Sequence, residues 1–133
     1  MKDTCVFCKI ARGEIPAKIV YENSKIIAFL DINPRNEGHT LVIPKAHYQS
    51  LLDMPEEILS ELLIVAKELC EKMKNKLQAK GFNLVINIGK VAGQEVPHFH
   101  LHIIPRYPDD GEVIKFGEIK QKNLEEVYHK LCE

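Results

Sequence analysis

The 133-residue sequence lacks long apolar runs, a strong excess of one charge and an N-terminal apolar segment. No run approaches the roughly 20 residues that span a bilayer, and the N-terminus lacks the apolar core of a signal peptide. Its 18 basic side chains are balanced by 19 acidic ones, which argues against a protein that wraps duplex DNA or binds an anionic membrane. We therefore expect a cytoplasmic protein without a nucleic-acid or membrane partner, and small molecules remain as candidate ligands.

Internal repeats, low-complexity tracts and linkers rich in Pro, Gly or Ser are also missing. With 45% apolar residues, the chain fits one domain over residues 1–133 and can bury one core. Four cysteines without an export signal argue against a disulfide framework, because cytosolic thiols are kept reduced. Cys70 and Cys132 are expected to be ordinary residues, whereas Cys5 and Cys8 form a pair that suggests metal binding.

Five segments have the β-branched and aromatic composition of strands. The first two are separated by Asn23-Ser24, which predicts a β-hairpin, and a polar loop over residues 31–38 precedes the third. The predicted strands cover residues 18–22, 25–30, 39–43, 82–88 and 98–105.

Apolar residues from Leu59 to Leu77 recur at three- and four-residue spacing, which predicts one long helix with a buried face. Asp53 and Glu56 resemble a capping box at its start, and Gly81 is expected to end it. A second amphipathic segment over residues 124–131 predicts a short helix near the C-terminus.

This order of elements predicts an α+β fold, in which the long helix covers one face of a five-stranded antiparallel sheet. A parallel sheet of βαβ units is excluded, because most of the strands are not separated by helices.

His98, His100 and His102 occupy alternate positions of the last predicted strand, so their side chains are expected to share one face of the sheet. The apolar residues between them then face the core. Rings this close would repel one another if all were protonated, so their pKa values should be coupled and mostly lowered. Three ionisable rings on one surface indicate a functional site rather than a solvated polar face.

The run from His98 to Ile104 is identified as the His-x-His-x-His-x-x signature, with x hydrophobic, of the histidine triad superfamily. Residues 5–10, 14–21, 29–32, 38–45 and 85–87 resemble the branch that contains the histidine triad nucleotide-binding proteins. The resemblance covers about residues 4–108 and leaves 109–133 as a C-terminal extension with an amphipathic helix, as in bacterial members. It also implies a short N-terminal helix.

The resemblance implies a homodimer whose two sheets join edge to edge. The long helix, placed by the sequence between Met54 and Lys80, would pack against its counterpart in the partner.

The resemblance implies a nucleotide hydrolase or transferase that cleaves the α-phosphate bond of purine nucleotide conjugates, such as adenosine phosphoramidate or an aminoacyl-adenylate. His100 is implied as the nucleophile, which forms a nucleotidyl-histidine intermediate that water then hydrolyses. A backbone carbonyl near His98 fixes the tautomer of His100, and His102 donates to the phosphate oxygens or the leaving group. His39 is implied to pack beside the triad and to hydrogen-bond the imidazole chain.

The resemblance also assigns residues that bind an AMP- or GMP-like nucleotide. Asp31 is implied to accept hydrogen bonds from the ribose hydroxyls. The remaining residues line the base pocket (Phe7, Ile10, Phe29 and Ile32) or contact the phosphate and the leaving group (Asn87, Gln94, His100 and His102).

Glu95 departs from the pattern, because many eukaryotic relatives carry Ser or Thr at this position. A carboxylate that faces the phosphate would repel it. Either Glu95 turns away or the preference for the leaving group differs.

The two-residue gap between Cys5 and Cys8 lets both thiolates reach one tetrahedral zinc ion. By resemblance to bacterial histidine triad proteins, His47 and His98 complete a Cys2His2 site with a structural role. The nucleotide chemistry would require no cofactor. The alternative interpretation is a reduced pair of free thiols.

Three other functions remain compatible with the sequence. A catalytic zinc held by His98, His100 and one more histidine would use a bound water as nucleophile. A non-catalytic nucleotide-binding or zinc-binding module would keep the pocket without turnover. Dinucleoside polyphosphate hydrolysis would use the same nucleophile on another substrate.

Overall fold

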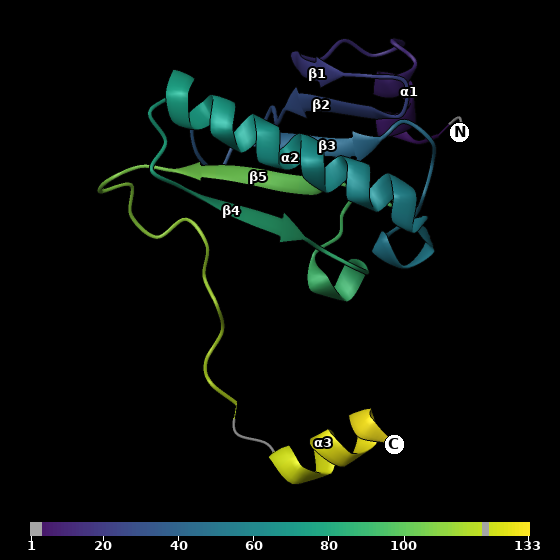
Figure 1. The fold of residues 1–133 in the computed structure, drawn as a ribbon, viewed down its shortest axis with the longest axis vertical. Coiled ribbons are helices and arrows are strands. Elements are labelled where there is room, and N and C mark those ends of the chain that lie inside the picture. The colour runs from purple at the N-terminus through teal and green to yellow at the C-terminus, as the bar shows by residue number, and fades with distance from the viewer. Residues whose placement is uncertain (1–3, 121–122) are drawn as a thin grey trace.

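The computed structural model of the protein describes residues 4–120 and 123–133. Its centre is a five-stranded antiparallel sheet with the strand order β1-β2-β3-β5-β4, and the long helix α2 (Glu56–Lys76) crosses one face (Figure 1). The strands are β1 (Ile19–Glu22), β2 (Ile26–Leu30), β3 (Thr40–Pro44), β4 (Gly81–Ile86) and β5 (Leu101–Arg106). The shorter helices are α1 (Val6–Ala11), the 3-10 turns η1 (Leu51–Asp53) and η2 (Lys90–Ala92), and α3 (Leu124–Cys132). The predicted α+β architecture is confirmed.

The predicted capping box at the start of α2 is wrong. The carboxylate of Asp53 instead accepts hydrogen bonds from the backbone amides of Gln49 and Ser50 at 3.1 and 2.9 Å, which caps η1. Pro55 precedes α2 and offers no side-chain cap. The reason is local competition, because Ser50 and Asp53 form a reciprocal capping box around the shorter turn.

The predicted end of α2 at Gly81 is also wrong. The helix stops at Lys76, and Gln78 takes the left-handed conformation at φ 59° that turns the chain back towards the sheet. Gly81 is the first residue of β4. Three residues therefore separate the helical cap at Leu77 from the strand, and the turn does not use the glycine.

β5 begins at Leu101, three residues later than predicted. The amide of Phe99 donates to the carbonyl of Tyr48 at 2.7 Å, so the backbone before β5 pairs with a loop instead of β3. The alternation of side chains nevertheless continues through this segment. The apolar residues between the histidines join the core beneath α2, while the histidines face the other side of the sheet.

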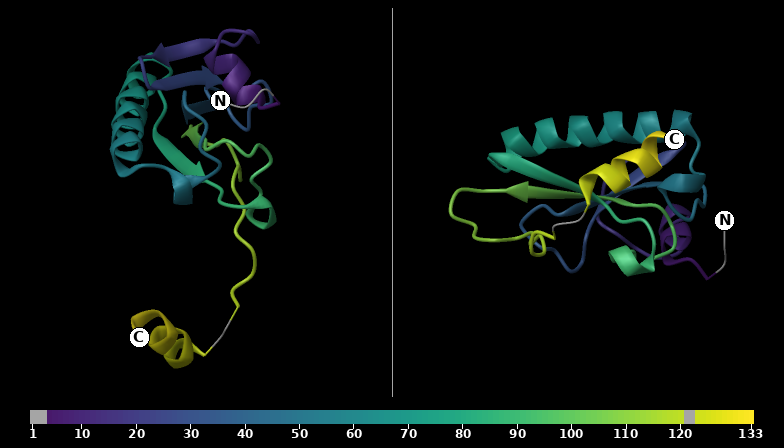
Figure 2. Two further views of the ribbon diagram at one scale, coloured as in Figure 1. Left: turned by 90° about the vertical axis from the view of Figure 1, so that its right-hand side faces the viewer. Right: turned by 90° about the horizontal axis from the view of Figure 1, so that it is seen from below.

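The sheet separates two apolar cores, because neighbouring residues of each strand face opposite sides. In β2, Ile26 and Ala28 pack in the core under α2, whereas Ile27 and Phe29 pack with α1. The left view of Figure 2 shows α2 and α1 on opposite sides of the sheet. The candidate site residues lie on the α1 side, so the face that builds the site is separate from the face that holds the long helix.

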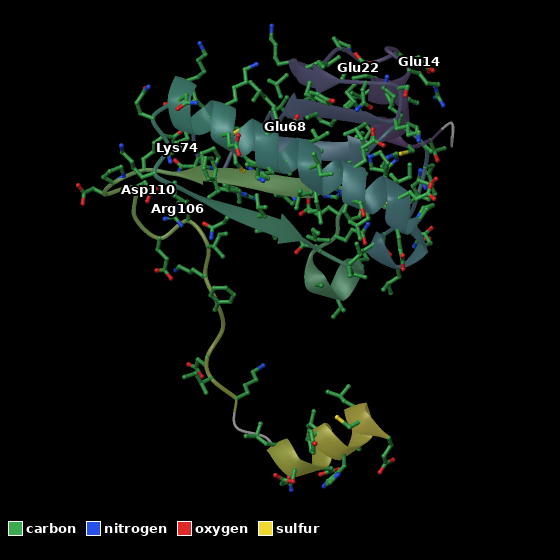
Figure 3. All side chains as sticks on the ribbon, viewed as in Figure 1. Glu14, Glu22, Glu68, Lys74, Arg106 and Asp110 are labelled. Carbon is green, nitrogen blue, oxygen red and sulfur yellow. The ribbon has the colours of Figure 1, made fainter. Side chains whose placement is uncertain are left out.

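The segment after β5 is tied to the domain by Arg106 and Asp110, which Figure 3 labels where the strand ends. The guanidinium of Arg106 donates from Nε and Nη2 to the two oxygens of Asp110, each at 2.9 Å. The side-chain amide of Asn36 and the backbone amide of Tyr107 donate to the same carboxylate, both at 2.8 Å. These bonds hold the pKa of Asp110 well below its ordinary range.

Beyond this anchor, residues 111–120 form neither helix nor strand, and α3 lies away from the sheet (Figures 1 and 2). Every residue of α3 is exposed. The predicted C-terminal helix is therefore present, capped by Asn123, whose side chain accepts from the amide of Glu126 at 3.0 Å. Within the part of the chain that the structure describes, no helix has the length and apolar character needed to cross a membrane.

Candidate active site

A cleft of about 640 Å³ opens on the α1 side of the sheet and is lined by His100 and His102. This volume lies within the roughly 300–1,000 Å³ of small-molecule sites. Because β5 lies between β3 and β4, the cleft has two different flanks. The flank formed by α1 and β2 is mainly apolar and ends at Asp31, whereas the flank on the β4 side carries Asn87 and Glu95.

His100 is held in one tautomer. Its Nδ1 lies 2.8 Å from the carbonyl oxygen of His98, and because a carbonyl can only accept, Nδ1 carries the hydrogen. Nε2 therefore keeps an unshared electron pair. The side chain is only 8% exposed, and this burial lowers its pKa, although the His98 carbonyl and the charges of Asp31 and Glu95 act in the opposite direction. At neutral pH the ring is a free base.

A second tautomer is fixed through His39. The backbone amide of Arg35 donates to His39 Nδ1 at 3.0 Å, so the hydrogen of this imidazole is on Nε2. His39 Nε2 lies 2.9 Å from His102 Nδ1 and donates to it. His102 must then carry its own hydrogen on Nε2. Burial and the neighbouring histidines lower the pKa of His102 to about 4, so it is a neutral hydrogen-bond donor.

His98 lies outside the cleft and faces the two N-terminal cysteines. Its Nε2 donates to the carbonyl of Pro44 at 2.9 Å, which leaves the electron pair on Nδ1. Nδ1 is 3.2 Å from Cys5 Sγ and 3.5 Å from Cys8 Sγ. His47 Nδ1 approaches Cys8 Sγ to 3.4 Å. The structure therefore brings together all four residues that the sequence analysis assigned to a metal site.

The residues expected around the nucleoside lie on the α1 and β2 flank. Phe7, Ile10 and Phe29 are buried side chains that line the cleft, and Ile32 is 91% exposed at its rim. Asp31 is half-buried at the end of β2, where Oδ1 accepts from the amide of Asn33 at 2.8 Å. Its other oxygen lies 3.6 Å from His39 Nε2. Each carboxylate oxygen has room for a further hydrogen bond from a ligand.

Asn87 and Gln94 were both expected at the phosphate, and the structure brings only Asn87 to the cleft. The amide of Gln94 is used within the loop. Its oxygen accepts from the amide of Gly89 at 2.9 Å, and its nitrogen donates to the carbonyls of Gln49 and Val96 at 2.6 and 3.1 Å. Gln94 therefore shapes the loop between β4 and β5.

Comparison with protein families matches residues 12–109 to the HIT domain. The chain belongs to the HIT family. It is 56% identical over 127 residues to an uncharacterized HIT-like protein of Methanocaldococcus jannaschii, which covers 96% of this chain and 98% of that protein. It is 43% identical over 110 residues to a Saccharomyces cerevisiae protein named adenosine 5'-monophosphoramidase, covering 83% of this chain and 67% of the yeast protein.

Solved structures of HIT proteins share the fold. A HIT family protein from Bacillus anthracis matches with a TM-score of 0.83 at 40% identity, covering 99% of this chain and 97% of that one. A zinc-bound histidine triad family protein from Mycobacterium smegmatis matches with a TM-score of 0.79 at 42% identity, covering 81% of this chain and 78% of that one.

The Cys5, Cys8, His47 and His98 cluster of this HIT protein fits zinc in its donor chemistry. One ligand atom from each residue lies within 4.8 Å of all the others. Two sulfur and two nitrogen donors form a typical tetrahedral zinc set. The Pro44 carbonyl accepts the Nε2 hydrogen of His98, which orients the ring and leaves Nδ1 free to bind a metal ion. Burial raises the pKa of Cys5 above its ordinary value, which a bound cation would oppose.

A catalytic metal in the cleft of this HIT protein is not supported by the donor atoms. Asp31, His39 and His102 place three possible ligand atoms within 4.8 Å. However, the Nε2 of His39 that points into this group carries the hydrogen, because the Arg35 amide occupies Nδ1. His100 belongs to neither group of possible ligands among the described residues.

Several cleft residues of the HIT domain could not be found from the sequence. Arg35 lines the cleft from the loop between β2 and β3, and Val113 and Ile114 line it from the segment after the Arg106 anchor. That segment lies beyond residue 109, where the family match ends. No local pattern distinguishes these residues from ordinary loop residues, so only the tertiary structure reveals them.

Proposed function

We propose that this HIT protein cleaves the α-phosphate bond of purine nucleotide conjugates, such as adenosine phosphoramidate or an aminoacyl-adenylate, through a nucleotidyl intermediate on His100. The observation that carries the proposal is the pair of fixed tautomers. An electron pair on His100 Nε2 and a hydrogen on His102 Nε2 are both available in the cleft, with the two rings 5.0 Å apart. A nucleophile beside a neutral donor suits attack on a phosphoryl group. The name of the yeast relative supports this substrate class.

The reaction would proceed in two displacements. First, the electron pair of His100 Nε2 forms a bond to the α-phosphorus, while the bond to the leaving nitrogen or oxygen breaks. The bonding electrons depart with the leaving atom. A leaving amine takes up one proton from water in the open cleft, whereas the carboxylate released from an aminoacyl-adenylate stays ionised. In the second displacement, a water oxygen attacks the phosphorus, the electrons of the Nε2–P bond return to His100, and one proton is released.

Neighbouring groups would support both displacements. The His98 carbonyl holds the Nδ1 hydrogen at 2.8 Å and stabilises the positive charge that the ring carries while bonded to phosphorus. The Nε2 hydrogen of His102 would bond to a phosphate oxygen. Asp31 would accept from the ribose hydroxyls, and Asn87 is available to the phosphate or the leaving group.

Mass spectrometry of protein quenched during turnover of adenosine 5'-phosphoramidate tests the proposal. An adenylyl adduct is expected on the peptide that contains His100, in the wild type and in a His129→Ala control whose changed residue lies on exposed α3. His100→Ala should lose both the adduct and the turnover. An active His100→Ala variant without an adduct would defeat the proposal. Diadenosine triphosphate, compared by kcat/KM, tests the nearest alternative substrate class.

We also propose that Cys5, Cys8, His47 and His98 bind a structural zinc ion. The donor set and the zinc-bound relative from M. smegmatis support this assignment. One zinc per chain is expected by elemental analysis after dialysis. Cys8→Ser should lose the metal and melt at a lower temperature. Cys132→Ser, which changes an exposed cysteine, should keep the zinc and the wild-type melting temperature. A metal-free wild type that binds no added zinc would contradict the assignment.

We further propose a homodimer formed through the β4 edge. β4 ends the sheet on one side, and Leu84 in this strand and Leu63 on α2 are 47% and 43% exposed. A strand edge with apolar side chains is suited to pairing with another copy. Light scattering should give the mass of two chains, and Leu84→Glu should lower it. A wild-type mass of one chain would reject the dimer.

A further inference from the structure

Glu95 is a carboxylate at the cleft that the proposed displacements do not use. It lies on the loop between η2 and β5 and lines the cleft on the β4 flank, together with Asn87 and His100. Its charge reaches the His100 ring, where it favours the protonated form and so raises the pKa against the effect of burial. Glu95 is therefore close to the position where a phosphorus atom would be attacked.

The backbone on both sides of Glu95 is fixed. Gln94 makes the three hydrogen bonds described above, and Val96 packs against the core on the α1 side. The Val96 carbonyl also accepts from the amide of His98 at 2.8 Å. These contacts position the backbone of Glu95 at the cleft, and rotation of its side chain sets where the charge lies.

The opposite flank carries Arg35 as well as the Asp31 carboxylate, so it holds one charge of each sign. Arg35 lines the cleft from the loop after β2, and its charge acts on His39 and His102, lowering the pKa of both rings. A phosphate bound at the histidines would therefore have a cation on the nucleoside side. On the β4 side it would face Glu95.

The position of the leaving group follows from the placement of the nucleoside. If the nucleoside fills the flank of α1 and β2, the group bonded to the phosphorus beyond it extends towards the β4 flank. An anionic leaving group there would approach the Glu95 carboxylate, whereas a cationic one would be attracted to it.

We propose that Glu95 selects the substrate by the charge of its leaving group, favouring nucleoside phosphoramidates of amines that carry a second, positively charged ammonium. The proposal rests on the proposed function and specifies its substrate class. For two unit charges assumed to be about 6 Å apart, an effective dielectric constant between about 20 and 80 corresponds to a change in binding of about threefold to a hundredfold. Glu95 attracts an ammonium leaving group and repels a carboxylate one, so the two effects add when these leaving groups are compared. We therefore expect the ammonium substrate to be preferred by at least about tenfold.

Three adenosine 5'-phosphoramidates of similar size test the proposal, with alkylamine leaving groups that end in an ammonium, a methyl ether or a carboxylate. The wild type should show the highest kcat/KM for the ammonium probe and the lowest for the carboxylate probe. Glu95→Gln should bring the three values together, and Glu95→Lys should reverse the order. Glu57→Gln is the control, because it removes a charge that is also exposed but lies on α2, across the sheet.

Binding separates this proposal from the proposed function. Calorimetry on the His100→Ala protein measures the affinity for the three probes without turnover, and the same order is expected. Equal affinities in that protein, or a wild-type preference that Glu95→Gln leaves intact, would overturn the role of Glu95 while the histidine chemistry stands. If the methyl ether probe is not turned over by the wild type, the proposed function itself fails.

Discussion

Gly38→Ala should destabilise the protein more than the same substitution at Gly13, although both glycines have positive φ. Gly38 has φ +88° and lies where β3 approaches the end of α2. A Cβ there would meet Leu77 Cδ1 at 2.7 Å and Pro105 Cγ at 3.1 Å. Gly13 has φ +78°, and an added Cβ would find no atom within 4 Å. The pair therefore separates the cost of the backbone conformation from the cost of crowding.

The left-handed conformation costs a residue with a Cβ roughly 1–2 kcal/mol, and overpacking adds about 1–3 kcal/mol. Gly13→Ala should therefore lower the free energy of unfolding by about 1–2 kcal/mol, and Gly38→Ala by about 2–5 kcal/mol. Leu77 can rotate, whereas the Pro105 ring is fixed in β5, so the crowding cannot be fully relieved.

Urea denaturation of both variants, followed by circular dichroism, measures the two free energies. Because His39 follows Gly38 and donates to His102, Gly38→Ala should also lower kcat while the protein is still folded. A loss of stability for Gly38→Ala no greater than that for Gly13→Ala would refute the reasoning from close contacts.

Three further predictions concern the cleft. The proposed reaction requires the neutral forms of His100 and His102, and burial lowers both pKa values, that of His102 to about 4. We therefore expect kcat/KM to stay constant as the pH falls to about 6.5 and to decline only below it. Between pH 6.5 and pH 4, the unfolded chain binds protons that the folded protein excludes, so the free energy of unfolding should also fall as the pH is lowered. A kcat/KM that already declines above pH 6.5 would contradict the first expectation, and a free energy of unfolding that stays constant from pH 6.5 to pH 4 would contradict the second. Asp31→Asn should raise KM for the ribonucleotide by about 10- to 100-fold, because charge-assisted hydrogen bonds to the ribose hydroxyls are lost. KM for the 2',3'-dideoxy analogue should change much less. Equal effects on both substrates would contradict the proposed contact between Asp31 and the ribose. His39→Phe removes the donor to His102 Nδ1 and should lower kcat by about 10- to 100-fold. Nitrogen NMR should then detect a mixture of His102 tautomers. A single, unchanged His102 tautomer would contradict the inference that His39 fixes it.

The sheet was predictable because the residue pattern that indicates a strand lies within each strand and does not depend on distant contacts. The alternation of histidines with apolar residues in the last strand gave the correct faces, although tertiary pairing with Tyr48 shortened the strand itself. The start of α2 was mispredicted because capping depends on which nearby backbone amides are free. The Asp53 carboxylate accepts from the amides of Gln49 and Ser50 before η1 and is not available to cap α2. Local patterns fix the type of an element more firmly than its ends.

For the site, the sequence alone indicated the three histidines and the cysteine pair, because their spacing is local. The assignments of His39 and His47 required resemblance to a family, since their contacts with His102 and Cys8 span 63 and 39 residues of chain. Gln94 illustrates the remaining gap. Its side chain has the right chemistry for a phosphate, but three backbone partners already use it, and these can be seen only in the folded loop.

The two faces of the segment that contains the histidines constrain how this protein can evolve. Inserting or deleting one residue between Pro97 and Ile103 would exchange the faces, burying imidazoles beneath α2 and turning Phe99 and Leu101 into the cleft. A single substitution in the segment changes one side chain, whereas a change in its length would disrupt the core and displace the histidines together. New substrate preferences are therefore expected to arise in the flanking loops, where Arg35 and Glu95 can change without moving a strand.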